Sequence, residues 1–346
     1  MSQMHFKLEY SVTPLILPTE SPLRLDLCDS EKLNVTIRCP TREELDKGFK
    51  NDTSFCTACL TREPSEKVRQ VFEQIDANKF RPANSEFFAC EYSNAQGVRI
   101  RTPGPDEFPE FFQLFLNELR TKLHDAAQRA TRILRWRTNE PGPPRPFGSI
   151  GFSWSFDGEH WYPVPSKLSV LFLGSHGTVH LLVKEQTDII DLLQSGHDEP
   201  ISHILFREAW EQRVSNPGSA LVIGMTSLEV GVKHLIGALV PNASWLAMNL
   251  PTPPLIQILS EYLPNLPTKC SFSGKVKSPP PAVLEELRKA VALRNGLAHR
   301  GQRPPDFEAL ERILRAVKDC LWLFDYYGGH SWASEFIRPD TLAALQ

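Results

Sequence analysis

The chain carries the stretch Leu293-Arg294-Asn295-Gly296-Leu297-Ala298-His299-Arg300 near its C-terminal end. The stretch closes a strongly helical segment and is followed by Pro304-Pro305. It places a guanidinium, an amide and an imidazole within about one and a half helical turns. A guanidinium offers a planar fork of donors to phosphate oxygens, and an imidazole exchanges a proton near neutral pH. These residue types together indicate phosphodiester chemistry without a metal ion.

Length and composition indicate a globular protein of two domains. The 346 residues exceed one typical core and fit two domains, since a domain usually holds roughly 100–200 residues. Hydrophobic residues make up 41% of the chain and charged residues 23%, so each domain can bury a core. A net charge of −3 argues against bulk electrostatic coating of nucleic acid, but it leaves room for a local basic patch.

The sequence predicts a cytoplasmic protein with no membrane partner. No continuous apolar run approaches the roughly 20 residues that cross a bilayer. The first residues, Met1-Ser2-Gln3-Met4-His5, lack the charged-then-apolar order of a signal peptide.

The cysteines favour free thiols over a metal centre. Seven cysteines, an odd number, do not form a disulfide framework. The one close pair is Cys56-Thr57-Ala58-Cys59, and a second close pair that would complete a zinc site is absent from the sequence. His176 and His180 flank a predicted turn without an identifiable third ligand. We expect no metal and no cofactor, with a structural zinc at the cysteine pair as the alternative.

Runs with a period of two predict strands in the first half of the chain. These runs cover residues 6–12, 23–27, 33–37, 86–92 and 98–101. Two hairpins are also expected, one with a two-residue turn at Asp157-Gly158 and one near 175–177. One long helix, predicted over 109–136, interrupts the strands because its apolar residues recur at steps of three and four.

The end of this long helix is rich in cations, namely Arg120, Lys122, Arg129, Arg132, Arg135 and Arg137. One interpretation is a solvated face that complements the helix dipole. The other is a surface that contacts the phosphate backbone of RNA. On that second interpretation the candidate RNA-binding residues are Arg129, Arg132 and Arg135, together with Arg300.

The pattern changes to helices after residues 194–200, so we place a domain boundary between 195 and 196. Helices are predicted over 201–214, from Ser219 as cap to 236, and over 255–263, 282–298 and 307–324. The chain is therefore predicted to be α+β, with a β-rich regulatory or sensor domain (1–195) and an all-α bundle (196–346). The motif closes the third long helix of the bundle.

The spacing of the motif sets a geometric requirement. Arg294 and His299 are five residues apart, so on a regular helix they differ by about 140° around the axis. Gly296 and the following prolines predict that the helix ends or loosens between them. Such an end would bring Arg294, Asn295 and His299 to one polar spot, particularly against a second copy of the helix.

The arrangement resembles the HEPN family of small helical-bundle ribonucleases, whose signature is arginine, four to six residues, then histidine. The matching residues are Arg294 and His299, with four residues between them, and the second helix has the look of that family in 227–233. The resemblance covers roughly 201–327 and none of residues 1 to about 195. It implies a homodimer in which two copies of the motif meet and cleave single-stranded RNA without metal.

The resemblance also implies a role for each matching residue. His299 would act as general acid or base, Arg294 would hold the scissile phosphate, and Asn295 would orient the phosphate or the imidazole. The products would be a 2′,3′-cyclic phosphate and a 5′-hydroxyl. Glu229 is a less favoured partner for Arg294.

We expect a prokaryotic antiphage or toxin nuclease that a regulatory protein or a phage-derived trigger controls. Two alternatives remain open. In one, the motif only caps its helix and complements the helix dipole. In the other, the helical domain is a noncatalytic module that dimerises or binds nucleic acid, and the β-rich domain recognises a ligand or partner.

Overall fold

The computed structural model describes residues 3–13, 22–28, 30–46, 53–80, 90–94, 97, 99–102, 104–140, 142, 147–164, 183–251 and 253–346. The chain forms two compact units. The N-terminal unit comprises Met1–Glu140 and Arg145–Asp198, and the C-terminal unit comprises Pro141–Pro144 and Glu199–Gln346. An antiparallel sheet in the first unit and a set of helices in the second confirm the α+β class.

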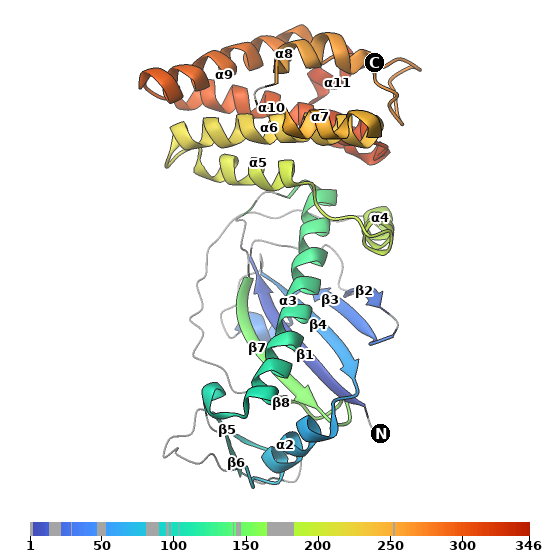
Figure 1. Cartoon of the computed structure of the whole chain (residues 1–346), viewed down its shortest axis with the longest axis vertical. Helices are drawn as coiled ribbons and strands as arrows, with labels where there is room; N and C mark the ends of the chain where they lie inside the picture. Colours follow the sequence, from blue (N-terminus) through green and yellow to red (C-terminus); the bar gives the residue numbers. More distant parts are fainter. Residues whose placement is uncertain are drawn as a thin grey trace. The chain divides into compact units, whose positions relative to one another are not determined.

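A six-stranded sheet with the order β2-β3-β4-β1-β7-β8 forms the centre of the N-terminal unit (Figure 1). All of its neighbouring strands are antiparallel. Its strands are β1 (Met4–Val12), β2 (Leu23–Cys28), β3 (Leu33–Arg38), β4 (Ser54–Arg62), β7 (Phe147–Ser155) and β8 (Tyr162–Pro163). A separate pair joins β5 (Cys90–Ser93) to β6 (Arg99–Thr102). The helical segments of this unit are α1 (Arg42–Asp46), α2 (Glu66–Asp76), η1 (Pro105–Glu107), α3 (Glu110–Thr138) and α4 (Val183–Gln194).

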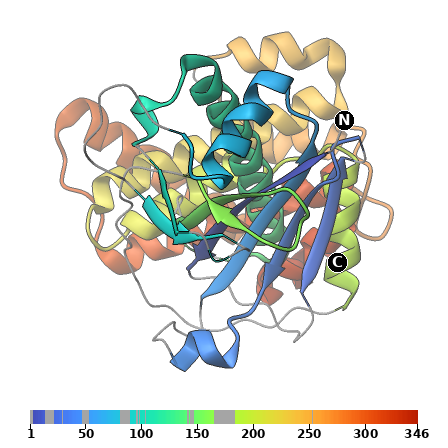
Figure 2. The same cartoon turned by 90° about the horizontal axis from the view of Figure 1, so that it is seen from below.

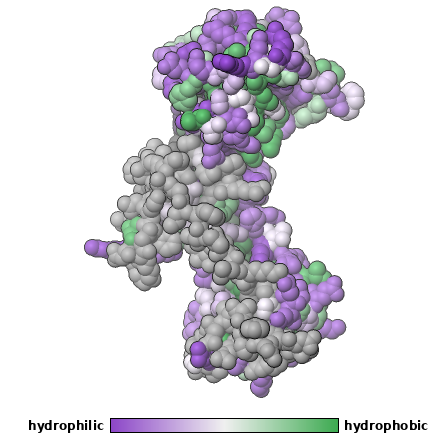
Figure 3. Space-filling view, turned by 90° about the vertical axis from the view of Figure 1, so that its left-hand side faces the viewer, coloured by the Kyte–Doolittle hydropathy of each residue, from purple (hydrophilic) through white to green (hydrophobic). Residues whose placement is uncertain are grey.

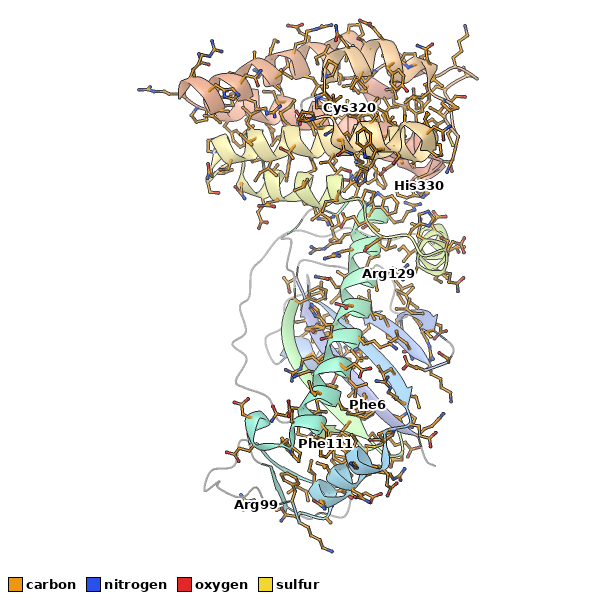
Figure 4. All side chains as sticks on the ribbon, in the orientation of Figure 1. Phe6, Arg99, Phe111, Arg129, Cys320 and His330 are labelled. Carbon is orange, nitrogen blue, oxygen red and sulfur yellow. The ribbon has the colours of Figure 1, made fainter. Side chains whose placement is uncertain are left out.

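Helix α3 crosses one face of this sheet and α2 lies beside it (Figures 1 and 2). The alternation along β1 turns Phe6 toward these helices, where it is fully buried. Its ring lies 5.9 Å from that of Phe72 in α2 and 5.8 Å from that of Phe115 in α3, centroid to centroid. Figure 4 shows Phe6 between the sheet and α3. The apolar alternation read from the sequence is therefore what joins the sheet to the predicted long helix.

The hairpin expected at Asp157-Gly158 has a wider connection than predicted. Strands β7 and β8 pair Trp154 with Tyr162, and residues 156–161 connect the two strands in place of a two-residue turn. The carboxylate of Asp157 accepts hydrogen bonds from the backbone N–H groups of Glu159 and His160, both at 2.8 Å. These bonds hold the wider loop and keep the pKa of Asp157 well below its usual range. The second expected hairpin, near 175–177, lies outside the described residues.

The C-terminal unit is a bundle around α6. Its α-helices are α5 (Ile201–Gln212), α6 (Pro217–Leu239), α7 (Ser244–Asn249), α8 (Leu255–Gln257), α9 (Pro281–Arg300), α10 (Phe307–Gly328) and α11 (Pro339–Leu345). Shorter helical turns are η2 (Pro241–Ala243), η3 (Ile258–Tyr262), η4 (Leu263–Asn265) and η5 (Ser331–Phe336). Helix α6 contacts α5, α9 and α10. Asn216, and not Ser219, caps α6, because the Asn216 side chain accepts from the Ser219 N–H at 3.2 Å.

Two glycines let α6 approach α10 closely. A Cβ atom added at Gly224 would lie 2.6 Å from Leu314 Cδ2, and one added at Gly231 would lie 2.9 Å from Leu321 Cδ2. Both leucines are buried in α10. Since the two glycines are two helical turns apart, they lie on one side of α6. A side chain at either position would push the helices apart or displace a buried leucine.

Helix α6, which the sequence predicted as a helix, is also long and apolar enough to cross a membrane, although polar residues interrupt its apolar run. In the structure 56% of its apolar stretch is buried, and Met225, Leu228 and Val232 are completely enclosed. On the face drawn in Figure 3, hydrophilic side chains cover much of the helical unit, with hydrophobic ones between them. A core helix of a bundle has the same length and composition, so α6 by itself does not indicate a membrane span.

We predict that Gly224→Ala lowers the free energy of unfolding by about 1–3 kcal/mol, because the new methyl overpacks against Leu314. Gly328→Ala is the matched control, since a Cβ there meets no atom of the described residues within 4 Å. It should change stability by less than about 1 kcal/mol. Urea unfolding measures both. No loss for Gly224→Ala would contradict the close approach of α6 and α10.

Candidate functional site

Helix α9 stays regular to its last residue, Arg300. Gly301 ends it in the left-handed conformation, with φ at 61°. The backbone N–H groups of Gly301 and Gln302 both donate to the carbonyl oxygen of Gly296. This is a common way for a helix to end. The expectation that the helix loosens at Gly296 is therefore wrong, because Gly301 and not Gly296 provides the break.

A regular helix separates the motif residues within one chain. Arg294 and His299 differ by about 140° around α9 and by about 7.5 Å along its axis. Asn295 and His299, four residues apart, share one side of α9, and both are exposed. The single spot expected to gather all three side chains in one chain is absent from this helix.

Arg294 instead turns toward α6 and forms an ion pair with Glu229. The distance between Arg294 Nη1 and Glu229 Oε1 is 2.5 Å. The two side chains are 24% and 13% exposed, respectively. A partly buried pair of this kind holds the guanidinium in one orientation. Glu229, which the sequence analysis gave as a less favoured partner, is therefore the residue that pairs with Arg294.

A pocket of about 250 Å³ opens beside this ion pair. Its apolar walls are Pro253, Pro254, Leu255, Ile256 and Val291. Its polar groups are Glu229, Gln257, Arg294 and Asn295. Apolar walls with a few converging polar groups are typical of small-ligand sites. His299 does not line the pocket and lies about one turn beyond Asn295 on the same exposed side of α9.

The site offers a carboxylate, a guanidinium and two amides to a ligand in the pocket, and an imidazole outside it. The guanidinium and the amides suit a phosphate or the polar edge of a planar ring. Among the residues that the structure describes, no group of three or more His, Cys, Asp or Glu side chains could hold a metal ion. No family model, curated protein or solved structure matches the chain.

The Cys56/Cys59 pair is not arranged to share a zinc ion. Both residues lie in β4, and residues three apart in a strand point to opposite faces. Burial raises the pKa of Cys56 to about 12 and that of Cys59 to about 11. The alternative of a zinc site at this pair is therefore wrong in its geometry. His176 and His180 lie outside the described residues.

Two of the candidate arginines of α3 are held within the protein, Arg129 by hydrogen bonds and Arg135 by burial. Arg129 donates to the carbonyl oxygens of Leu193 at 3.0 Å and of His197 at 2.9 Å, and Figure 4 shows it on α3 at the level of α4. Arg135 is only 2% exposed. A buried guanidinium cannot contact an RNA backbone, so its expected RNA-binding role is wrong.

The other two candidate RNA-binding residues, Arg132 and Arg300, have at least partly exposed side chains. Arg132 Nη1 lies 3.9 Å from the carboxylate of Asp198, and its side chain is 36% exposed. Arg300 is exposed at the end of α9, next to His299. Of the four candidates, Arg300 is therefore the one beside the proposed site.

We predict that Arg129→Ala lowers the free energy of unfolding of the N-terminal unit by about 1–3 kcal/mol, because two carbonyl groups lose a charged donor. Arg132→Ala, one turn away on the same helix, should cost no more than about 1 kcal/mol, because its ion pair is long and partly exposed. Denaturant unfolding compares them. Equal effects of the two substitutions would show that the Arg129 contacts contribute nothing specific.

Proposed function

We propose that the chain is a metal-independent endoribonuclease of HEPN type that cleaves single-stranded RNA. One observation carries the proposal. In a helical bundle, the Arg294–Glu229 pair and Asn295 line a pocket, and an exposed histidine, His299, follows on the same helix. Arg294, which can donate hydrogen bonds to a phosphate, and His299, which can carry a proton, thus lie on one helix, separated by about 7.5 Å along its axis and by about 140° around it.

In the proposed reaction Arg294 binds the scissile phosphate through the donors that Glu229 leaves free, and it stabilises the charge that develops there. Asn295 orients the phosphate. The 2′-oxygen of the ribose bonds to phosphorus and loses its proton, while the bond from phosphorus to the 5′-oxygen breaks and that oxygen gains a proton. His299 moves these protons as general base or acid. The products are a 2′,3′-cyclic phosphate and a 5′-hydroxyl.

Because Arg294 and His299 lie on different sides of α9, the proposal includes a second copy of the chain. His299 points away from the phosphate that its own Arg294 would hold. In the proposed two-fold homodimer the exposed sides of two α9 helices face each other, which is an isologous interface. His299 of one copy then serves the phosphate bound by Arg294 of the other, and each dimer holds two such sites.

The proposal includes a cytoplasmic setting in prokaryotic antiphage defence or in a toxin system. The N-terminal unit would then sense a regulatory protein or a phage-derived trigger. The exposure of His299 on the side away from Arg294 favours one competing function, a dimeric RNA-binding module without catalysis. Cleavage assays separate the two functions, because binding alone leaves RNA chains intact.

We predict that the protein cuts single-stranded RNA in the presence of a chelator and leaves 2′,3′-cyclic phosphate ends. His299→Ala should slow cleavage by about 10²–10⁴-fold, because the proton carrier is lost. His234→Ala is the matched control, since His234 is an exposed histidine of α6 that does not line the pocket. Intact RNA with the wild-type protein, or equal rates for His299→Ala and wild type, would refute the nuclease.

A further inference from the structure

The pocket beside Arg294 has the size and lining of a site for one nucleobase. Its volume of about 250 Å³ is below the roughly 300 Å³ at which pockets for drug-sized ligands begin. Pro253 and Leu255, which line the pocket, are buried, and Val291 of α9 also lines the space. Apolar walls of this kind suit the flat faces of a base that has left its stack.

The polar lining selects among the bases. We propose that the pocket binds guanine, so that the proposed nuclease cleaves RNA next to guanosine. The inference rests on the proposed function and names the substrate of the same site. Its basis is the position of the Glu229 carboxylate, which lines the pocket at 13% exposure.

An ionised carboxylate only accepts hydrogen bonds, through two oxygens. Arg294 holds Oε1 of Glu229 at 2.5 Å, and each carboxylate oxygen has a second lone pair for another donor. Guanine presents two adjacent donors, N1–H and the 2-amino group, on its Watson–Crick edge. Adenine presents an acceptor at N1 and would face the carboxylate with a lone pair. Among the RNA bases, guanine therefore fits Glu229 best.

A second group in the pocket complements the remaining atom of that edge. Gln257 and Asn295 both line the pocket, and a side-chain amide donates well to a carbonyl oxygen such as guanine O6. Cytosine offers one donor group beside an acceptor, and uracil offers one donor between two acceptors. Neither pyrimidine matches a carboxylate and an amide in the way that guanine does.

The position of the pocket connects base binding to the cleavage step. Arg294 and Asn295 belong both to the pocket and to the proposed phosphate site. A guanosine with its base in the pocket therefore has its own phosphate at Arg294, and the bond next to that guanosine is the one cut. The ion pair with Glu229 then couples recognition of the base to the orientation of the guanidinium.

The test is equilibrium binding of the 3′-monophosphates of guanosine, inosine and adenosine to the full chain, by calorimetry. Inosine differs from guanosine only by the missing 2-amino group. We expect the guanosine nucleotide to bind at least about tenfold more tightly than either of the others. Equal affinity for guanosine and inosine nucleotides, or tighter binding of the adenosine nucleotide, would overturn the inference.

Three variants test whether Glu229 and the pocket are responsible for the guanosine preference. Glu229→Gln should remove the difference between the guanosine and inosine nucleotides. Glu286→Gln should retain it, because Glu286 pairs with Lys289 on α9 at 2.9 Å and does not line the pocket. Val291→Phe should block all three nucleotides without altering a charged group. Retention of the guanosine preference in Glu229→Gln would place recognition elsewhere and overturn the assignment.

Failure of this inference and failure of the proposed function give different results. Nucleotide binding requires no cleavage, so a guanosine preference in a protein that leaves RNA intact would support the pocket and reject the nuclease. An oligonucleotide that contains each base once tests the converse. Cleavage next to guanosine is expected, and equal cleavage at all four bases would retain the nuclease and overturn the guanine pocket.

Discussion

The close packing of α6 against α10 is the constraint on which the site depends. Gly224 and Gly231 lie on the side of α6 that meets Leu314 and Leu321. Glu229 lies about 140–160° around α6 from these glycines, and there it meets Arg294 of α9. The same helix therefore uses one side for tight packing and the other for a partly buried charge. If the glycine side packed differently, Glu229 would no longer face α9.

The ion pair with Glu229 fixes the orientation of the Arg294 side chain. A long arginine side chain on a helix surface normally sweeps a wide volume of solvent, whereas Arg294 is held at a pocket by a carboxylate 2.5 Å away. The regular end of α9 leaves Asn295 and His299 on the exposed side. Each proposed catalytic site thus takes Arg294 from one chain and His299 from the other. This division is the physical reason for including a second copy in the proposed function.

Local periodicity predicted the elements that bury one face against a single partner. The alternation along β1 and the three-and-four spacing in α3 and α10 have this form, and the structure confirms these elements. Strand β4 was missed because six of its nine residues are buried, so its sequence shows little alternation of apolar and polar residues. The cations of α3 illustrate another limit. Their sequence did not reveal that residues 193–197 bring carbonyl groups back to Arg129.

The residue types of the motif could be identified from the sequence, but their arrangement could not. The break at Gly301 depends on backbone conformation, and the sequence analysis placed it at Gly296 instead. The pocket joins residue 229, residues 253–257 and residues 291–295, which only the tertiary fold brings together. The Glu229 contact likewise depends on the packing of α6 and α9.

The most direct test of the central claim, a site shared between two chains, mixes the two inactive variants Arg294→Ala and His299→Ala and measures RNA cleavage. In a mixed dimer one site keeps both Arg294 and His299, and the other site has neither. With random pairing of the two variants we predict about a quarter of wild-type activity, since half of the dimers are mixed and each has one intact site. Activity no higher than that of either variant alone would contradict the account.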